Sequence, residues 1–272
     1  MLVDAHNHLQ DDRLWPHREA VLARARNAGI GLQVVNGTHP GDWERVAQLA
    51  RKNTDIVPFY GLHPWEVSNA ETDWLAQLEA QLASGNSGIG EIGLDRWISP
   101  RDEAAQEAAF RAQLQLATRY NRPCAIHCLR AWGWLMDVLR SETLPDTPLL
   151  LHSYGGSTEM VDELLAFNVY FSFSGSVAEP KRHKQREALR RVPLHRLLLE
   201  TDAPDMLPPT PLKQHSIAQP DGPEANEPAN LPGIVAFVAR ERDLLLDELI
   251  AQVQANSWRF LGDVLGNRAP KT

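Results

Sequence analysis

Short apolar runs alternate along this chain with longer segments in which apolar residues recur at helical spacing. Each run is short enough for a β-strand and apolar enough to be buried on both faces, as the strands of parallel sheets are. Eight such runs are present, at Leu2–Ala5, Ile30–Val35, Ile56–Tyr60, Gly88–Ile92, Cys124–Ile126, Leu149–Leu151, Val169–Phe173 and Leu197–Leu199. The segments between them are rich in strong helix formers and predict helices at Arg18–Asn27, Trp43–Lys52, Asp73–Ala83, Glu103–Arg119, Trp132–Arg140, Glu159–Ala166 and Lys184–Arg191.

Repeated strand–helix units predict an α/β fold, and eight of them fit a closed parallel barrel of the TIM-like (β/α)8 type. The chain has 272 residues, close to the roughly 250 of such barrels, so we expect residues 1–272 to form one barrel domain. An open, doubly wound sheet is the alternative. That fold normally carries a glycine-rich phosphate loop after its first strand, whereas this chain has His6-Asn7-His8 there. Two more helices are predicted at the end of the chain, at Ile234–Arg242 and Asp247–Leu261.

One long stretch, from Pro208 to Pro232, is rich in proline and shows little apolar periodicity. It lies between the eighth predicted strand and the helix that follows it. We therefore expect a long loop over the mouth of the barrel. Irregular loops of this length inside a compact domain are usually functional or mobile.

Composition limits the kinds of partner that this chain can have. A formal charge of −8 argues against a broad surface for nucleic-acid phosphates, although bound metal ions would reverse the sign of charge in a local cleft. The first residues show neither the basic nor the apolar region of a signal peptide, and no apolar run approaches the ~20 residues that span a bilayer. Cys124 and Cys128 form no CxxC pair, so we expect neither a disulfide framework nor a thiolate zinc site. We expect a cytoplasmic monomer with no membrane partner.

Polar residues able to bind metals stand where the apolar strands stop. In a parallel barrel, the carboxyl ends of all strands meet at one face, where active sites are built. The residues in question are His6, His8, His63, Glu91, His127, His152 and Asp202. With His63 set aside, four imidazoles and two carboxylates suffice to bind two divalent ions.

The spacing of these residues has a physical reason. Residues i and i+2 of an extended segment point to the same side, so His6 and His8 can chelate one ion while Asn7 faces away. Glu91 comes from a strand roughly opposite, and a carboxylate can bridge two ions. A carbamylated lysine could also bridge two ions, but no lysine lies in an apolar run of this chain. Glu91 is therefore the predicted bridging ligand.

These residues lie in motifs that resemble those of the TatD-type metal-dependent hydrolases, in the wider amidohydrolase-like group of barrels. The motifs follow the family's order over nearly the whole chain. They are Asp4-Ala5-His6-Asn7-His8-Leu9, Gly61-Leu62-His63-Pro64-Trp65, Gly90-Glu91-Ile92-Gly93-Leu94-Asp95, Ile126-His127-Cys128, His152-Ser153-Tyr154-Gly155-Gly156, Ser172-Phe173-Ser174-Gly175, Leu199-Glu200-Thr201-Asp202-Ala203-Pro204 and Asn226-Glu227-Pro228.

The resemblance implies a role for each residue. One metal would be bound by His6, His8, Glu91 and Asp202, and the second by Glu91, His127 and His152. His63 would face the substrate rather than a metal. The family's activity is hydrolysis of phosphodiester bonds in DNA, so the resemblance implies a deoxyribonuclease that acts on DNA 3′ ends. We expect two divalent ions, Mg, Mn or Zn: mixed imidazole and carboxylate ligands suit Zn and Mn by softness, and Mg stays open because a phosphoryl substrate brings oxygen ligands of its own.

The catalytic assignment follows from this arrangement. A metal-activated water would attack the phosphodiester, with Asp202, Glu91 and His63 as the catalytic residues. Asp202 would position the water and accept its proton. The chemistry of a carbonyl substrate would be the same, so a hydrolase of amide, ester or lactone bonds in a small molecule stays open. A binding protein without catalysis would have lost at least one ligand, and none is missing here.

The chain departs from the family's pattern around the metals but not at the ligands. Leu129 stands where relatives often have an arginine after the fifth-strand histidine, and Arg130 follows it. The Gly-Leu-Asp motif is followed by Arg96-Trp97 rather than Tyr or Phe, and Ala225 replaces an arginine before Asn-Glu-Pro. We expect Arg130, and after it Arg96, to contact the substrate together with His63.

Three further expectations concern neighbours of the site. Asp4 is expected to orient a neighbour of the metal histidines rather than to bind metal itself. Asp95 is expected to be a turn or helix-capping residue. Trp132 and Trp134 are expected to pack against the barrel rather than to stack on bases.

Overall fold

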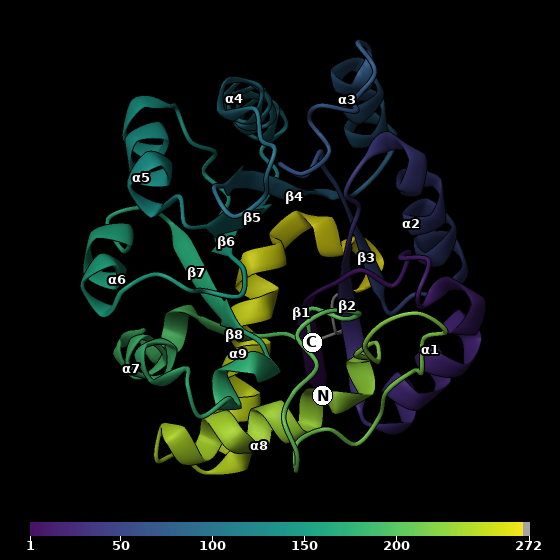
Figure 1. Ribbon diagram of the computed structural model, residues 1–272, viewed down its shortest axis with the longest axis vertical. Coiled ribbons are helices and arrows are strands. Elements are labelled where there is room, and N and C mark those ends of the chain that lie inside the picture. The colour runs from purple at the N-terminus through teal and green to yellow at the C-terminus, as the bar shows by residue number, and fades with distance from the viewer. Residues whose placement is uncertain (269–272) are drawn as a thin grey trace.

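Eight parallel strands form the centre of the computed structural model, which describes residues 1–268 (Figure 1). Each strand pairs with the next one along the chain, in the order β1 to β8. Their bounds are β1 Leu2–Asn7, β2 Ile30–Asn36, β3 Ile56–Tyr60, β4 Gly88–Asp95, β5 Cys124–Leu129, β6 Leu149–Leu151, β7 Val169–Phe173 and β8 Leu197–Leu199. Residues 269–272 of the expected domain lie outside the described part of the chain.

Backbone hydrogen bonds beyond the end of β8 bring the last strand back to the first. The N–H of Asp202 donates to the carbonyl of His6 at 3.0 Å, and the N–H of His8 donates to the carbonyl of Ala203 at 2.7 Å. The sheet is therefore a nearly closed barrel, and the strictly sequential strand order excludes the doubly wound alternative.

Helices alternate with the strands and surround the barrel (Figure 1). Their bounds are α1 Arg18–Asn27, α2 Pro40–Lys52, α3 Trp74–Ser84, α4 Glu103–Tyr120, α5 Trp132–Ser141, α6 Thr158–Leu164, α7 His183–Arg191, α8 Leu231–Glu241 and α9 Leu246–Leu261. Short 3-10 helices occur at Trp15–His17, Gly175–Ala178, Leu194–Arg196, Pro228–Asn230 and Gly262–Arg268. All predicted strands and long helices are confirmed, with ends that differ by a few residues.

The strands β4 and β5 are longer than predicted because polar residues continue their ladder. Gly93 pairs with His127 and Asp95 with Leu129, beyond the point at which the apolar runs stop. Gly93 has a φ of +146°, and a Cβ atom there would lie 2.0 Å from the carbonyl oxygen of His127. Only glycine permits this approach, which sets the strand of Glu91 directly against the strand of His127.

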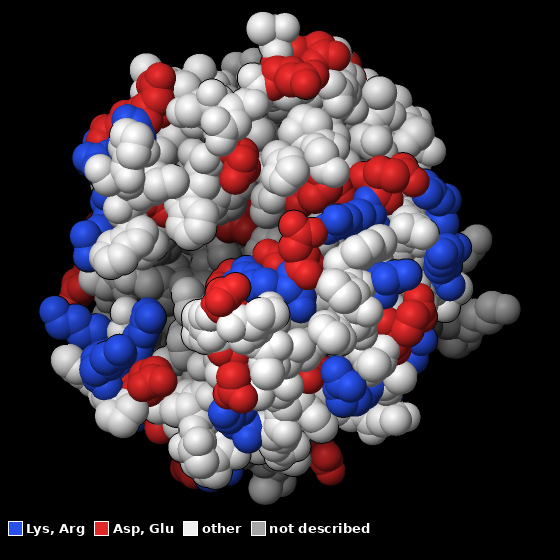
Figure 2. All heavy atoms as spheres, turned by 45° about the vertical axis from the view of Figure 1, so that its right-hand side comes forward, with Lys and Arg blue, Asp and Glu red and all other residues white. Residues whose placement is uncertain are grey.

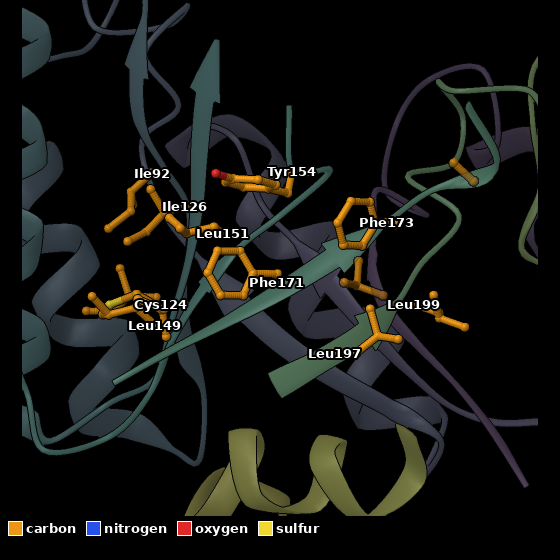
Figure 3. Close-up of a cluster of buried hydrophobic side chains, with 14 of the residues drawn as sticks. Ile92, Cys124, Ile126, Leu149, Leu151, Tyr154, Phe171, Phe173, Leu197 and Leu199 are labelled. Atoms are coloured by element: carbon orange, nitrogen blue, oxygen red, sulfur yellow. The ribbon is translucent and has the colours of Figure 1, made fainter. Parts of the chain in front are cut away.

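Alternate residues of each strand build two separate apolar layers. Leu150, Tyr170 and Leu198 belong to a cluster that also contains Phe260 and Leu261 of α9. These residues fill the inside of the barrel, and α9 closes its end. The neighbours of these residues along each strand point the other way and pack beneath the surrounding helices. They include Ile126, Leu149, Leu151, Phe171, Leu197 and Leu199 (Figure 3). This period of two is what a parallel barrel covered by helices requires.

The irregular loop in the proline-rich segment after β8 is shorter than predicted. Pro228–Asn230 form a 3-10 helix and Pro232 lies in the first turn of α8, where a residue without an N–H is readily accommodated. The irregular part contacts the segment after β1, because the side-chain amide of Gln219 lies 3.5 Å from the carbonyl oxygen of Arg13. An antiparallel bridge between Ile217 and Ala225 holds it together. Among the described helices, none is both long and apolar enough to cross a bilayer.

Candidate metal centre and active site

The seven side chains predicted at the strand ends converge at the carboxyl end of the barrel. They come from six strands or from the turns that directly follow them, namely β1 (His6, His8), β3 (His63), β4 (Glu91), β5 (His127), β6 (His152) and β8 (Asp202). All are buried except His127, which is partly buried. The space-filling view in Figure 2 shows a hollow with acidic atoms inside it, bordered by uncharged side chains on one side and by basic and acidic side chains on the other. The structure thus brings the seven side chains together at one end of the barrel.

Glu91 divides its two carboxylate oxygens between two groups of histidines. Oε2 lies 3.3 Å from His6 Nε2 and 3.1 Å from His8 Nε2. Oε1 lies 2.7 Å from His152 Nε2, 3.0 Å from His127 Nδ1 and 3.2 Å from His63 Nε2. A carboxylate placed in this way presents one oxygen to each group of histidines.

Asp202 completes the group around His6 and His8. Its Oδ1 lies 3.7 Å from Nε2 of both histidines, and the rings of His6 and His152 stack with centroids 4.0 Å apart. The ligand atoms of His6, His8 and Glu91 all lie within 4.8 Å of one another, as do those of His6, His152 and Asp202. These donor sets fit divalent ions by chemistry, since they combine neutral imidazole nitrogens with carboxylate oxygens.

His63 also lies within this distance of Glu91 and His127, so distance alone would make it a seventh ligand. Its hydrogen bonding argues otherwise. The backbone N–H of Trp65 donates to Nδ1 of His63 at 3.1 Å, so Nδ1 is an acceptor. A neutral imidazole then carries its proton on Nε2, the atom that faces Glu91. A nitrogen that holds a proton donates a hydrogen bond and offers no lone pair to a metal.

A hydrogen-bond partner on the second ring nitrogen fixes the orientation of two of the metal-site histidines. Nδ1 of His8 lies 2.8 Å from the carbonyl oxygen of Asn36, which leaves Nε2 free to face the cluster. Nε2 of His127 lies 2.8 Å from Oδ2 of Asp95, which leaves Nδ1 as the free nitrogen. Metal-binding histidines typically donate their other nitrogen to such an acceptor, which sets the tautomer and the ring angle.

Two buried carboxylates support the site in ways that the sequence interpretation missed or only partly anticipated. Glu200 accepts a hydrogen bond from the N–H of Ser153 at 2.7 Å and another from the hydroxyl of Ser172, and thereby positions the turn that carries His152. Asp95 accepts the backbone N–H groups of Trp97 and Ile98, as expected for a turn residue, but it also holds His127. The available signal was that both residues lie inside the motifs that contain Glu91 and Asp202.

Asp4 has the orienting role that was expected. Its carboxylate accepts hydrogen bonds from the N–H of Thr201 at 2.9 Å, the hydroxyl of Thr201 at 2.6 Å and the side-chain amide of Asn7 at 3.0 Å. It thereby ties β1 to the residue before Asp202. Asp202 itself has a φ of +55°, a left-handed conformation that aspartate tolerates better than most residues.

The charges in the cluster are arranged around Glu91. Burial on its own would raise the pKa of Glu91, but the nearby histidines His152 and His63 hold that pKa well below its usual range. Burial would lower the pKa of His8, but the Glu91 carboxylate raises it to about 9. Burial lowers the pKa of His63, consistent with a neutral ring. The buried carboxylates thus stabilise positive charge in their surroundings, and a bound divalent ion would supply such a charge.

The two arginines predicted to contact the substrate are both exposed but differ in their partners. Arg96 lies 2.9 Å from a carboxylate oxygen of Glu103. Arg130 places its guanidinium 4.2 Å above the ring of Trp97 and has no ion pair among the described residues. Trp132 and Trp134 are partly buried against the barrel's apolar layer, as expected.

Comparisons with known proteins agree with this geometry. Residues 3–262 match the family model described as TatD related DNase. The 3′-5′ ssDNA/RNA exonuclease TatD of Klebsiella pneumoniae (strain 342) is 34% identical over 260 residues, which cover 91% of this chain and 93% of that protein. The uncharacterized metal-dependent hydrolase YjjV of Escherichia coli (strain K12) is 32% identical over 225 residues, 82% of this chain and 85% of that protein.

Structural comparison gives the same answer. The crystal structure of YjjV, a TatD homolog from Escherichia coli K12, superposes with a TM-score of 0.87 at 28% identity, over 95% of this chain and 97% of that one. A dihydroorotase from Saccharomyces cerevisiae shares the fold at 13% identity, with a TM-score of 0.59. With the motifs, the barrel and the family match in agreement, the chain belongs to the TatD-related DNase family of metal-dependent hydrolases.

Proposed function

We propose that this protein is a metal-dependent nuclease that removes nucleotides from the 3′ ends of DNA. The observation that carries the proposal is the division of the Glu91 oxygens between His6 and His8 on one side and the remaining histidines on the other. Several relatives bear the name 3′-5′ ssDNA/RNA exonuclease, which favours single strands and extends the expected substrate to RNA.

Six residues would hold two divalent ions. One ion would be bound by Asp202, His6, His8 and Glu91. The other would be bound by His127, His152 and the same Glu91. When bound, such ions lower the pKa of water and neutralise the oxygens of a phosphodiester. Mg, Mn and Zn each suit this chemistry, because the substrate brings oxygen ligands of its own.

The chain's own side chains supply positioning and proton transfer. The carboxylate of Asp202, whose Oδ1 lies 3.7 Å from Nε2 of both His6 and His8, would accept the proton of the attacking water. Nε2 of His63, which carries a proton, donates to an oxygen of the phosphodiester in place of its present contact with Glu91. Arg130, which has no carboxylate partner among the described residues, contacts a phosphate farther along the strand.

Hydrolysis of a carbonyl substrate on the same site is the competing assignment. The solved barrels of carbonyl-group hydrolases match this chain at low identity, which is a likeness of fold alone. The relatives that match at over 30% identity include named nucleases. Nucleic acid is therefore the substrate class that we propose.

A substrate panel tests the proposal directly. Metal-reconstituted protein is given a linear single strand with a free 3′ end, the same strand blocked at the 3′ end, a circular single strand, a blunt duplex and simple amides and lactones. We expect mononucleotides from the free 3′ end, little product from the blocked or circular strands, and slower cleavage of the duplex. Faster hydrolysis of amides or lactones than of any nucleic acid would refute the nuclease assignment.

A further inference from the structure

We propose that Trp65 and Trp97 form a stacking platform for the unpaired bases of a single strand, beside the metal centre. The proposal rests on the nuclease function above and names the part of the protein that holds the nucleobases. The residues assigned so far would contact only metal, phosphate and water, so they give no reason for a preference between paired and unpaired ends.

The platform is visible in the distribution of exposed apolar side chains. Among the described residues, the large hydrophobic side chains that are exposed are Met1, Trp65, Trp97, Leu129, Leu245 and Leu246. Met1 lies at the start of the chain, and Leu245 and Leu246 lie at the start of α9. The other three follow or end consecutive strands, because Trp65 comes after β3, Trp97 after β4 and Leu129 at the end of β5. They therefore gather at one side of the active-site rim.

The two tryptophans are exposed far more than packing would require. Trp65 is 46% exposed and Trp97 is 57% exposed, whereas the tryptophan of α2, Trp43, is 2% exposed. A large aromatic side chain left in water next to an active site has a face or edge available for a partner. Scattered exposed apolar residues are normal, but three at neighbouring strand ends form a local surface.

One carboxylate fixes both tryptophans relative to the metal centre. Oδ2 of Asp95 accepts the indole N–H of Trp65 at 2.9 Å, and Oδ1 accepts the backbone N–H of Trp97. The same Oδ2 lies 2.8 Å from Nε2 of His127. Asp95 thus contacts the ring of a metal-site histidine, the indole N–H of Trp65 and the backbone of Trp97.

The platform lies within one nucleotide of the proposed chemistry. The Trp65 ring centroid is 5.1 Å from that of His63 and 6.2 Å from that of His127. A base attached to a phosphodiester at His63 therefore reaches the indole of Trp65. The guanidinium of Arg130 covers one face of the Trp97 ring, so the other face is left for a base and a cation for the phosphate stands beside the same ring.

Nucleobases are the occupant that these observations favour. Base–aromatic stacking tolerates any sequence, because every base has a π-face, and it requires a base that is not already stacked in a duplex. A cation beside the ring matches the alternation of base and phosphate along a strand. Hydrolysis of single strands with little sequence preference follows from this surface.

The test compares normal and abasic substrates. One oligonucleotide carries thymine at its last two 3′ positions, and a matched one carries abasic tetrahydrofuran residues there. We expect the wild-type protein to show kcat/KM on the order of tenfold lower for the first cleavage of the abasic strand. In Trp65→Leu and Trp97→Leu, kcat/KM for the normal strand should fall by a similar factor. For the abasic strand, kcat/KM of these variants should be close to that of the wild type. Trp65→Phe, which keeps a ring but lacks the N–H to Asp95, should lie between Trp65→Leu and the wild type.

Leu246→Ala is the matched control, since this exposed apolar residue lies at the start of α9. It should behave as the wild type on both strands. Equal losses by the tryptophan variants on both substrates would show that they act through the metal site rather than through bases. A change of oligomeric state in Trp65→Leu or Trp97→Leu, measured by sedimentation, without any base-dependent loss would identify the surface as a protein contact and overturn the proposal.

A binding measurement separates this proposal from the nuclease function. Affinity of the chelator-treated protein for the two oligonucleotides is measured by fluorescence anisotropy. If the wild-type protein cleaves no nucleic acid but binds the normal strand more tightly than the abasic one, the function fails and the platform stands. If it cleaves nucleic acid but binds and cleaves both strands alike, the platform is wrong and the function stands.

Discussion

Oδ2 of Asp95 lies 2.8 Å from Nε2 of His127, so a buried carboxylate outside the metal-binding set holds one of the histidines within it. Asp95→Asn keeps the size of the side chain but removes its charge. We expect this change to lower the affinity for the ion bound through His127 by about 10- to 100-fold, because the ring loses a charged acceptor. Titration calorimetry with Mn²⁺ measures it.

The control for this change is Asp102→Asn, an exposed substitution at the N-terminus of α4 where the side chain accepts the N–H of Ala105. It should leave metal affinity unchanged. Unaltered Mn²⁺ affinity in Asp95→Asn, in a variant that melts like the wild type, would show that His127 is not oriented through Asp95.

Glu91→Ala should remove both of the proposed ions together. The reason is that its two oxygens face separate groups of histidines, 3.1 Å from His8 and 2.7 Å from His152. Metal content after reconstitution and desalting, measured by plasma mass spectrometry, should fall to less than half of the wild-type value. His127→Ala is the comparison, since it should weaken only the second set. Full metal content in Glu91→Ala would exclude a bridging role.

His63→Ala and His152→Ala should separate substrate contact from metal binding. The Trp65 N–H directs the proton of His63 to Nε2, so His63→Ala should keep its metal content while turnover falls by about 100-fold or more. His152→Ala should lose both metal and activity. The measurements are metal content and kcat on a single-stranded oligonucleotide. Loss of an ion in His63→Ala would mean that His63 is a ligand.

Arg130→Ala should weaken binding of nucleic acid more than Arg96→Ala does. Arg96 is already paired with Glu103 at 2.9 Å, whereas Arg130 has no ion pair among the described residues. We expect KM for an oligonucleotide to rise several-fold in Arg130→Ala, and the slope of log K against log salt to fall by about 0.7 for one lost phosphate contact. A small phosphodiester should be cleaved at a similar rate by both variants. Identical salt slopes for Arg130→Ala and the wild type would contradict this role.

Chelation should destabilise the folded protein as well as inactivate it. A ligand that binds only the folded state at about 100 times its Kd stabilises that state by about 2.7 kcal/mol. For a domain of this size, removal of the ion should therefore lower Tm by about 5 to 10 °C, and adding Mn²⁺ should restore it. Differential scanning calorimetry measures the shift. The triple variant His6→Ala, His8→Ala, Glu91→Ala should show no response to chelator, and a response as large as that of the wild type would place the ions elsewhere.

The sequence determined the order and nature of the elements of this barrel. The eight apolar runs were sufficient to place every strand, because strands buried on both faces are predominantly apolar, with few polar residues such as Gln33 and Ser172 inside them. The same property marked the site, since histidines and carboxylates at the ends of such runs must meet in a parallel barrel. His6, His8, Glu91, His127, His152 and Asp202 are brought together as this reasoning requires.

Only the tertiary structure decided which atoms face one another. The protonated nitrogen of His63 depends on a hydrogen bond from Trp65, and the free nitrogen of His127 depends on a carboxylate 32 residues earlier in the chain. Among the described residues Arg96 forms an ion pair and Arg130 does not, and this difference likewise depends on where Glu103 lies. Local sequence patterns report burial and periodicity, which act over one turn or one strand. Hydrogen-bond partners, tautomers and exposed aromatic surfaces arise between strands, so they are fixed only when the barrel closes.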